Sequence, residues 1–492
     1  MVRISCHDTA RGGTKPRARK VKLARHLLSY APVKLVGALC AFGGIYVFTR
    51  LLSADQYGRY ALMFSVMALM HTLSLTWVEA AAYRFTAKAQ KDNMLPDHFR
   101  TALVLLLRAL AVGLFLVLVL LVVTWDMPDY RVFVPYIALL IPCNALIKIA
   151  LEAHKASQQV RHYALVAMTK MLLGFVVGAL LAWKTGLGAV APFAGLVFAA
   201  ACLVWVEGRW LFKQALGGYS DGTTRRAWLS YGIPTALALM LDMLLSSGDR
   251  FFIAYFIDEA AVGSYAAGYG VADKTVLVLC AWVALASSPL MMAAYEKGGR
   301  RAAQEQSKNF VTMLLLVGLP AATGLALVAD PLAEAMIGEN VREQARRIIP
   351  WIAFAGLFNG LLIHYFSESF NLAHKTRIRA LLMLVPLVMN IVLNIILIPI
   401  YGVMGAVIST LVCYIAAVIL LGLVGRKYIS LGIPVKNTVR IMIACAAMWP
   451  VIALVPAYGS WTELLIKTAA GGVVYAAMIY MLNVANIRQL VR

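Results

Sequence analysis

The stretch "TRLLSADQYGRYALMF", residues 49–64, places a short polar segment between two long apolar runs. The stretch "AYFIDEAAVGSYAAGY", residues 254–269, repeats this outline 205 positions later. Both contain the pattern Gly-x-Tyr-Ala, which begins at Gly58 in the first copy and at Gly263 in the second. A polar segment that occurs twice in this way indicates that the chain contains a duplicated unit.

The composition shows what kind of unit is duplicated. Of the 492 residues, 62% are hydrophobic and only 14% are charged, and the mean hydropathy is +0.78. A soluble protein carries about a quarter charged residues. Apolar runs of about 20 residues, each long enough to cross a hydrocarbon core of about 30 Å as a helix, recur along almost the whole chain. The sequence therefore predicts an all-α polytopic membrane protein.

Fourteen apolar segments are expected to span the membrane, at about 31–50, 60–80, 101–124, 132–151, 163–183, 187–206, 230–257, 262–292, 310–329, 348–371, 380–399, 402–424, 438–457 and 463–485. Loops after even-numbered segments are rich in Lys and Arg, whereas loops after odd-numbered segments hold mainly acids. Arg342, Arg346 and Arg347 are exceptions to this alternation. The positive-inside rule then places both termini in the cytoplasm.

The formal net charge is +22, which the cationic loops explain, so we expect no nucleic-acid partner. Residues 1–30 form a basic tail, expected to lie in the cytoplasm on anionic membrane lipids. Six of the seven cysteines fall inside apolar runs, and none has a spacing typical of disulfides or zinc ligands. We therefore expect no metal site.

Further matches between the two parts of the chain follow in the same order: "WV" at 77–78 and 282–283, "AHK" at 153–155 and 373–375, and "GAV" at 188–190 and 405–407. The predicted architecture is two parallel six-helix bundles, 31–212 and 228–426, around a central cavity, with two extra C-terminal helices in 437–486. Parallel repeats flank the central site of many transporters, where one half rocks against the other. The two Gly-x-Tyr-Ala copies would form outer hairpins, in which glycine lets the chain turn and tyrosine lies at the membrane interface.

Three pieces of the sequence carry a resemblance to a known family: "TRLLSADQYGRYALM", "SSGDRFFIAYFIDEAAVGSYAAGYGVADK" and "LIPIYGVMGAVIST". They resemble bacterial polysaccharide flippases of the multidrug/oligosaccharidyl-lipid/polysaccharide exporter superfamily, over roughly 30–425. The resemblance implies a protein of the inner membrane that flips a polyprenyl-pyrophosphate-linked oligosaccharide to the periplasmic leaflet for exopolysaccharide, capsule or O-antigen assembly. It would act as a monomer, alongside a polysaccharide polymerase and export machinery.

Ionisable residues inside the apolar segments are the candidate site residues, because a charge at the bilayer centre costs at least about 2.5–3.5 kcal/mol. Arg250 is a candidate ligand of the pyrophosphate, since arginine binds phosphate oxygens with two parallel hydrogen bonds. Six further cations are candidates for the cavity wall: Arg50, Lys34, Arg108, Lys148, Lys170 and Lys274. The alternative for such long side chains is that they reach the membrane interface.

The candidates for ion or proton coupling are Asp249, Asp242, Glu79, Asp273, Glu368 and His364. The spacing of Asp242, Ser246 and Asp249 predicts one shared helical face, and His364 and Glu368, four residues apart, share another. Gly248 and the serines before it form a candidate flexing point. A structural hydrogen-bond network is the alternative for each acid. The coupling cation would be Na⁺ or H⁺, and no other cofactor is expected because the chain has no nucleotide-binding motif.

Three other functions are alternatives. A cation-coupled drug exporter of the same fold should carry an acid in its first apolar segment, and 34–49 contains none. A peptidoglycan lipid-precursor flippase shares the fourteen-segment layout, so the sequence separates it poorly. A polysaccharide polymerase or ligase should have a large periplasmic loop with catalytic side chains, and the chain has no such loop. We therefore expect a transporter and not an enzyme.

Overall fold

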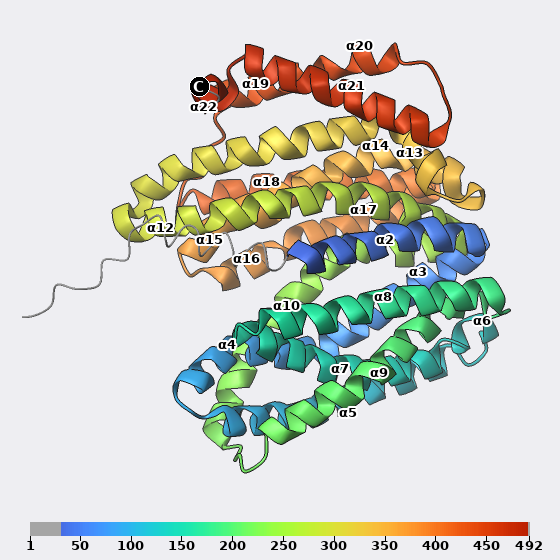
Figure 1. Cartoon of the computed structure of the whole chain (residues 1–492), viewed down its shortest axis with the longest axis vertical. Coiled ribbons are helices and arrows are strands. Elements are labelled where there is room, and N and C mark those ends of the chain that lie inside the picture. The colour runs from blue at the N-terminus through green and yellow to red at the C-terminus, as the bar shows by residue number, and fades with distance from the viewer. Residues whose placement is uncertain (1–30, 491–492) are drawn as a thin grey trace, which may run out of the picture.

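The structure, a computed structural model, describes residues 31–490, and helices without any strand make up this range (Figure 1). The first half of the molecule contains α2 (Ala31–Leu51), α3 (Ala54–Ser74), α4 (Thr76–Lys91), α5 (Leu95–Val123), α6 (Pro128–Arg131), α7 (Val134–Ala156), α8 (Val160–Lys184), η1 (Gly188–Val190) and α9 (Ala191–Gln214). The predicted basic tail, 1–30, lies outside the described residues.

The second half contains α10 (Gly222–Ser247), α11 (Asp249–Phe256), α12 (Glu259–Leu327), α13 (Ala329–Met336), α14 (Glu339–Leu361), η2 (Leu362–Phe366), α15 (Glu368–Leu372), α16 (Thr376–Leu382), α17 (Leu384–Tyr401) and α18 (Val403–Gly425). The remaining helices are α19 (Val435–Ala446), α20 (Met448–Ala453), α21 (Ser460–Met481), η3 (Val484–Asn486) and α22 (Ile487–Leu490). Figure 1 shows α19 to α21 on the outer side of the second half, beyond α12 and α14.

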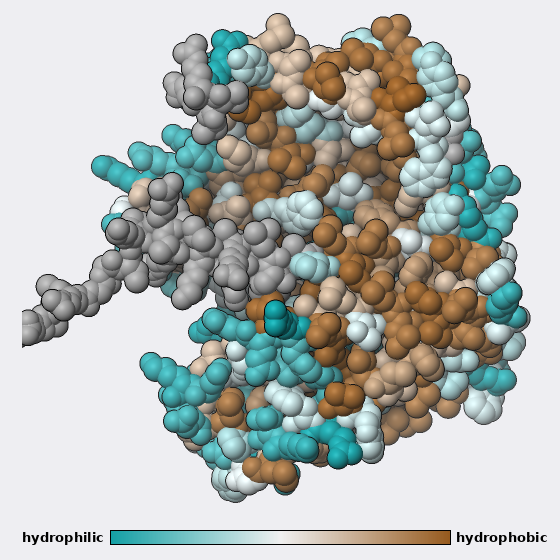
Figure 2. Space-filling view, in the orientation of Figure 1, coloured by the Kyte–Doolittle hydropathy of each residue, from teal (hydrophilic) through white to brown (hydrophobic). Residues whose placement is uncertain are grey.

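In Figure 2, apolar residues form a band through the middle of this face, and hydrophilic residues gather along its left and right sides. Twelve helices in the described range are long and apolar enough to cross a membrane, or thirteen if α3 and α4, which meet at an angle of 54°, form one span. The chain is thus a multi-pass helical membrane protein. The exact number of fourteen spans stays a prediction.

The 69-residue helix α12 is counted once among these twelve, although Gly299 interrupts it with a non-helical φ of 64°. The chain folds back near this point into two arms (Figure 1). Residues 293–309 were predicted as a loop, and they are instead the helical ends of these arms. Alanines and long polar side chains such as those at 301–308 favour helix even where they leave the apolar region.

The polar segment after α2 starts a helix instead of forming a long hairpin. The predicted second span began at 60, but α3 begins at Ala54 because Ser53 caps it. The Ser53 hydroxyl accepts a hydrogen bond from the Gln56 amide, and the Gln56 side chain accepts one from the Ser53 amide, which satisfies two free backbone donors. Asp258 caps α12 in a similar way by accepting from the amide of Ala261.

The two repeated glycines lie inside helices, so the prediction that they form turns is wrong. A Cβ on Gly58 would lie 1.7 Å from the carbonyl oxygen of Glu259, and a Cβ on Gly263 would lie 2.7 Å from that of Ala54. The absence of a side chain at both positions therefore lets α3 and α12 cross with their backbones in contact. The two copies of the motif pack against each other, one from each half.

Two clusters of buried apolar side chains form the core. One consists mainly of residues from α3 to α9, and the other mainly of residues from α11 to α18. Ile45 and Phe48 of α2, and Leu52 just after it, belong to the second cluster, so this helix connects the two halves. The predicted division into 31–212, 228–426 and 437–486 stays a prediction.

Candidate functional site

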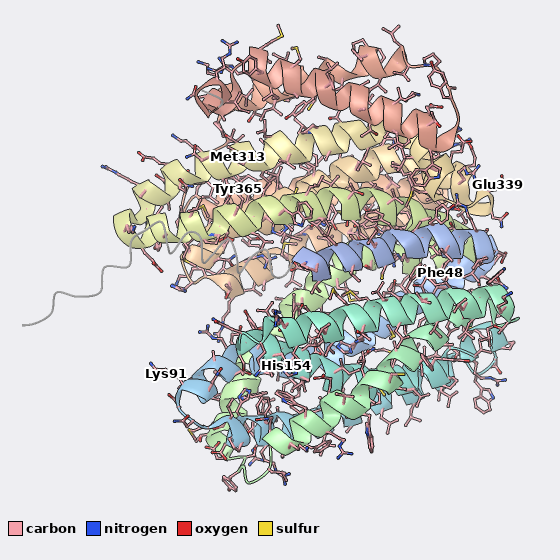
Figure 3. All side chains as sticks on the ribbon, in the orientation of Figure 1. Phe48, Lys91, His154, Met313, Glu339 and Tyr365 are labelled. Carbon is pink, nitrogen blue, oxygen red and sulfur yellow. The ribbon has the colours of Figure 1, made fainter. Side chains whose placement is uncertain are left out.

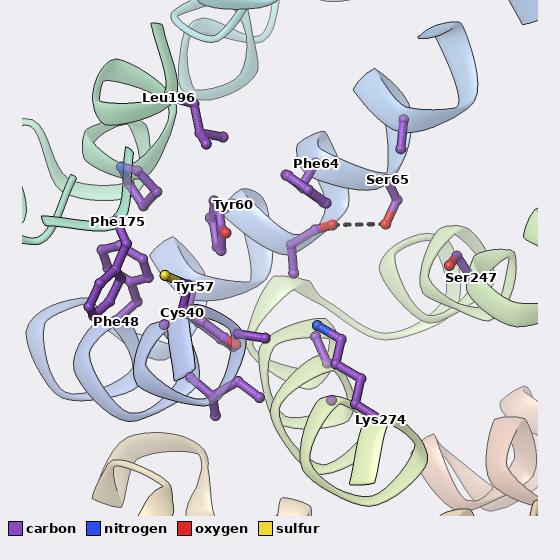
Figure 4. A pocket seen from close by; sticks show the side chains of 18 of the residues that line it. Cys40, Phe48, Tyr57, Tyr60, Phe64, Ser65, Phe175, Leu196, Ser247 and Lys274 are labelled. Carbon is purple, nitrogen blue, oxygen red and sulfur yellow. Dashed lines mark hydrogen bonds between the residues drawn. The ribbon is translucent and has the colours of Figure 1, made fainter. Parts of the chain in front are cut away.

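A cavity of about 450 Å³ lies between the two halves. Helices α2, α3, α8 and α9 form one wall, and α10, α11 and α12 form the other (Figure 4). The first wall is rich in aromatic side chains: Phe48, Tyr57, Tyr60, Phe64 and Phe175. The second wall contributes the cations Arg250 and Lys274, and no aspartate or glutamate is among the described residues that line the cavity. The cavity is therefore positively charged on one side and aromatic on the other.

Arg250 has hydrogen-bonding capacity left for a ligand. Its Nη1 donates to the hydroxyl oxygen of Ser65, at 2.8 Å, across the cavity. Its Nε is buried and has no hydrogen-bond partner among the described residues. Figure 4 shows the side chain of Lys274 directed into the same space. Two cations in a cavity whose described lining residues include no acid suit an anionic group, because guanidinium and ammonium groups bind phosphate oxygens.

A second cavity, of about 430 Å³, is lined by the first half and by Leu239 of α10, and three predicted site residues border it. Glu79 is buried there; its Oε1 lies 2.7 Å from Nε2 of His71, and its Oε2 lies 3.8 Å from Nζ of Lys148. Lys170 and Asn144 also line this cavity. The structure thus brings together the predicted Glu79, Lys148 and Lys170, and these cations lie around the acid and not in the central cavity.

Asp249, at the start of α11, is fully buried in the second half and is surrounded by neutral donors. Its Oδ2 accepts hydrogen bonds from the hydroxyls of Tyr265, at 2.6 Å, and Thr410, at 2.5 Å. Its Oδ1 accepts from the amide nitrogens of Asn390, at 3.1 Å, and Asn394, at 2.7 Å. No cationic side chain among the described residues forms an ion pair with this carboxylate.

Asp242 of α10 and Asp249 of α11 were predicted to share one helical face, but their partners lie on different helices. Asp242 forms an ion pair with Arg379 of α16, at 3.1 Å, whereas Asp249 contacts α12, α17 and α18. The helix is interrupted between them at Gly248, where the sequence predicted a flexing point. In α12, Asp273 accepts a long hydrogen bond from Asn359, at 3.5 Å. Asp242 and Asp273 therefore each contact a partner within the second half, and their role in coupling stays a prediction.

Arg50 joins the two halves at the predicted periplasmic end instead of lining the central cavity. Its guanidinium donates to the carbonyl oxygens of Ala335, at 3.0 Å, and Met336, at 3.2 Å, where α13 ends. Cations are stabilised at helix C-termini, which carry partial negative charge. The hydroxyl oxygen of Thr49 accepts a hydrogen bond from the amide of Gly338, at 2.9 Å. The end of α2 is thus tied to the α13–α14 connection.

The remaining predicted residues lie outside the central cavity. Glu368 accepts a hydrogen bond from the hydroxyl of Ser288, at 3.0 Å, and no hydrogen bond between the described side chains joins it to His364. His364 lies in η2, a π-helical turn that changes the spacing between the two residues. Lys34 and Arg108 are exposed on the outside of α2 and α5. Their predicted roles in substrate binding remain untested.

Several residues of these sites were missed from the sequence. Asn390 and Asn394 are four residues apart in an apolar helix, which places both amides on one face, and this spacing was a signal that could have been used. Ser65 and Thr410 carry no comparable signal, because serine and threonine hydroxyls commonly bond to their own helix, as both do here. The contact of Tyr265 with Asp249 joins two helices and has no local signal either. Their contacts depend on how distant helices pack.

A sequence profile of the family described as polysaccharide biosynthesis protein matches residues 47–346. The chain belongs to this family. The matched region holds both copies of the repeated motif, Arg250 and Lys274. The predicted family relationship is therefore confirmed. No curated protein matches the chain by sequence.

Solved structures of the MOP superfamily share the fold. The lipid II flippase MurJ in an inward closed conformation is 16% identical, with a TM-score of 0.73 over 95% of this chain and 100% of its own. An inward-facing multidrug resistance MATE transporter is 14% identical, with a TM-score of 0.62 over 80% and 93%. A variant of the Vibrio cholerae MATE transporter VcmN is 16% identical, with a TM-score of 0.58 over 83% and 98%. At such low identity these likenesses establish the fold, which is that of membrane transporters and flippases.

Proposed function

We propose that this protein flips a polyprenyl-pyrophosphate-linked oligosaccharide from the cytoplasmic to the periplasmic leaflet of a bacterial inner membrane, with both termini in the cytoplasm. The observation that carries the proposal is the acid-free cavity between the halves, in which Arg250 and Lys274 face a wall of aromatic rings. The cations suit a pyrophosphate, and the rings provide flat apolar faces for sugars. The product would then serve a polymerase and export machinery on the periplasmic side.

The sign of the cavity argues against the drug-exporter alternative for cationic drugs, because Arg250 and Lys274 repel a cation and no described lining residue offsets them. A peptidoglycan lipid precursor is a closer rival, since it is also lipid-linked and anionic. A competition experiment, in which each lipid is tested as an inhibitor of the transport of a labelled lipid, distinguishes the two functions. In the proposed role, an oligosaccharide-linked lipid inhibits transport of a labelled one more strongly than lipid II does.

Movement of the substrate requires the predicted periplasmic end to open. In this structure that end is held by the Gly58–Gly263 crossing, by the Thr49–Gly338 hydrogen bond, and by the hydrogen bond that Tyr130 donates to Glu259, at 2.8 Å. We infer that the halves rock apart here while the pyrophosphate stays on the cations. The polyprenyl tail remains in the bilayer between the halves.

A coupling cation, Na⁺ or H⁺, fits the surroundings of Asp249. Burying a carboxylate without a positive partner is costly, and its four partners are all neutral. The hydroxyl of Thr410 has a single proton but lies 2.5 Å from Asp249 and 2.9 Å from the carbonyl of Ala406. The Oδ1 of Asn394 is buried and has no hydrogen-bond partner in the described part of the chain. One proton or one small cation held by these oxygens would balance the charge.

The test is transport in proteoliposomes that contain a fluorescent polyprenyl-pyrophosphate oligosaccharide. Arg250→Ala should reduce flipping at least tenfold, because a charge-assisted phosphate contact is worth about 1.5–3 kcal/mol. The matched control is Arg347→Ala, which removes an arginine whose side chain is 68% exposed and paired with Glu343 on the surface, and it should flip at the wild-type rate. Equal rates in the two variants would remove Arg250 from the site, and no flipping by the wild type would refute the proposed function.

A further inference from the structure

A cluster of two histidines and one glutamate lies at the predicted cytoplasmic end of the first half. His154 is near the end of α7, His162 is in the first turn of α8, and Glu207 is in α9. Figure 3 labels His154 at this end of the molecule. One ligand atom from each of the three residues can be chosen so that all lie within 4.8 Å of one another. None of the three belongs to the central cavity or to the proposed coupling site.

The ligand atoms are spaced for a transition metal. Nε2 of His154 lies 3.0 Å from Oε2 of Glu207, and Nε2 of His162 lies 3.0 Å from Oε1. Zinc binds such atoms at about 2.0–2.2 Å in a tetrahedral arrangement, which separates neighbouring ligand atoms by about 3.3–3.6 Å. Small side-chain shifts are enough to reach these distances. Two histidines, one glutamate and an open fourth position are a ligand set that zinc uses in proteins.

The hydrogen bonds of His154 suit a positive species at the centre of the cluster. Its Nδ1 lies 2.8 Å from Oε1 of Gln159, and its Nε2 faces the Glu207 carboxylate, so both ring nitrogens face acceptors. A neutral imidazole has only one N–H group. With Nδ1–H donated to Gln159, the lone pair of Nε2 points at a carboxylate, and a second proton or a metal ion relieves that contact. A neutral ring with Nε2–H on Glu207 would instead need the Gln159 amide turned so that its NH2 group faces Nδ1. Metal-bound histidines almost always donate their other N–H to such an outer partner.

Burial and access also fit a bound ion. Glu207 is 0% exposed and His154 is 1% exposed, so the carboxylate has lost its hydration. The side chain of His162 is 45% exposed and borders a cavity of about 590 Å³ that is also lined by Gln158, Arg161 and Trp210. This cavity provides an entry path and room for water as the fourth ligand. We propose that His154, His162 and Glu207 bind a divalent transition metal of the zinc class and thereby fasten the α7–α8 connection to α9.

The repeat supplies a matched control for this site. His374 corresponds to His154 in the second "AHK" copy, but it is exposed, and the only metal-ligand group of this kind in the described range is the one around His154. A site in one half alone would stiffen the first half without affecting the second. The cavity beside His162 shares no lining residue with the central cavity, so metal binding can be measured separately from transport.

The experiment titrates Zn²⁺ into the purified full-length protein in detergent after chelator treatment, with metal content measured by mass spectrometry and affinity by calorimetry. We expect one zinc ion per chain. His162→Ala should weaken binding by more than about 100-fold, beyond the loss caused by removing an outer partner, whereas His374→Ala should bind as the wild type does. Gln159→Ala should weaken binding about tenfold through the orientation of His154.

His162 is chosen because its exposed side chain can be removed without disturbing the core, and a normal size-exclusion profile verifies folding. A rise in the thermal unfolding temperature on adding Zn²⁺, present in the wild type and in His374→Ala but absent in His162→Ala, would support the site. Equal zinc binding by the wild type and His162→Ala, or no stoichiometric binding by the wild type, would overturn it. If the wild type binds no stoichiometric zinc, a second proton on the His154 ring lies between this ring and the Glu207 carboxylate instead of a metal ion.

Discussion

Two of the buried carboxylates, one in each half of the molecule, have different partners. Glu79, in the first half, lies beside His71 and Lys148 and borders a cavity. Asp249, in the second half, is fully buried among neutral hydroxyl and amide groups. The first acid is neutralised by the protein itself, whereas the second leaves room for an external cation. Two acids of the same chemical type are therefore suited to different roles, a structural one and a coupling one.

The largest expected effect comes from removing the charge that lacks a cationic partner. Asp249→Asn keeps an oxygen that can accept hydrogen bonds from Tyr265 and Thr410, so the protein should still enter the membrane. Transport should lose its stimulation by a Na⁺ or proton gradient, a loss of about 5–150-fold if the coupling energy is typical. Flipping in proteoliposomes with and without each gradient measures this, and gradient-stimulated transport by the variant would contradict the role given to Asp249.

The second effect concerns stability. Glu79→Gln leaves His71 and Lys148 without their buried acid, and breaking such a pair costs about 3 kcal/mol. The control is Glu343→Gln, because the surface pair of Glu343 with Arg347 is worth less than about 1 kcal/mol. Unfolding of both variants in detergent gives the difference. If the two destabilise the protein equally, the cluster around Glu79 is not a structural one.

The smallest effect compares the tyrosines of the two repeated motifs. Tyr265→Phe removes a hydrogen bond to a buried carboxylate and should destabilise the protein by about 1.5–3 kcal/mol. Tyr60→Phe keeps the ring packing against Phe193 and should change stability by less than about 0.5 kcal/mol. Thermal unfolding of the pair checks this. If Tyr60→Phe lowers stability more than Tyr265→Phe does, the hydrogen bond of Tyr265 to Asp249 is not the stabilising contact that we infer.

The sequence predicted the fold class well because membrane spans depend on local properties. Long apolar runs and loop charges locate helices, and the repeat indicated two related halves. The residues at which the helices begin and end were less predictable. The cap at Ser53 extends α3 backward by several residues, and the break at Gly299 lies inside a segment that was expected to be a loop.

The candidate site was predictable only in part, since the sequence identifies charges but not their directions. Arg250 and Lys274 do reach the central cavity, whereas Lys148 and Lys170 reach a separate one. Arg50 is only two residues from Phe48, which lines the cavity, yet its guanidinium donates hydrogen bonds to the end of α13. These outcomes depend on contacts between helices that are hundreds of residues apart, which no local pattern encodes.

The crossing of Gly58 and Gly263 also bears on how fast the molecule can change shape. Because the contact is made by main-chain atoms of two preformed helices, no side chain has to give up rotamers at that point when the halves come together. Closing an interface of long side chains costs up to about 2 kcal/mol of entropy for each one that is ordered. A bare backbone crossing avoids this cost, so the contact between α3 and α12 itself can separate and close again with little entropic penalty.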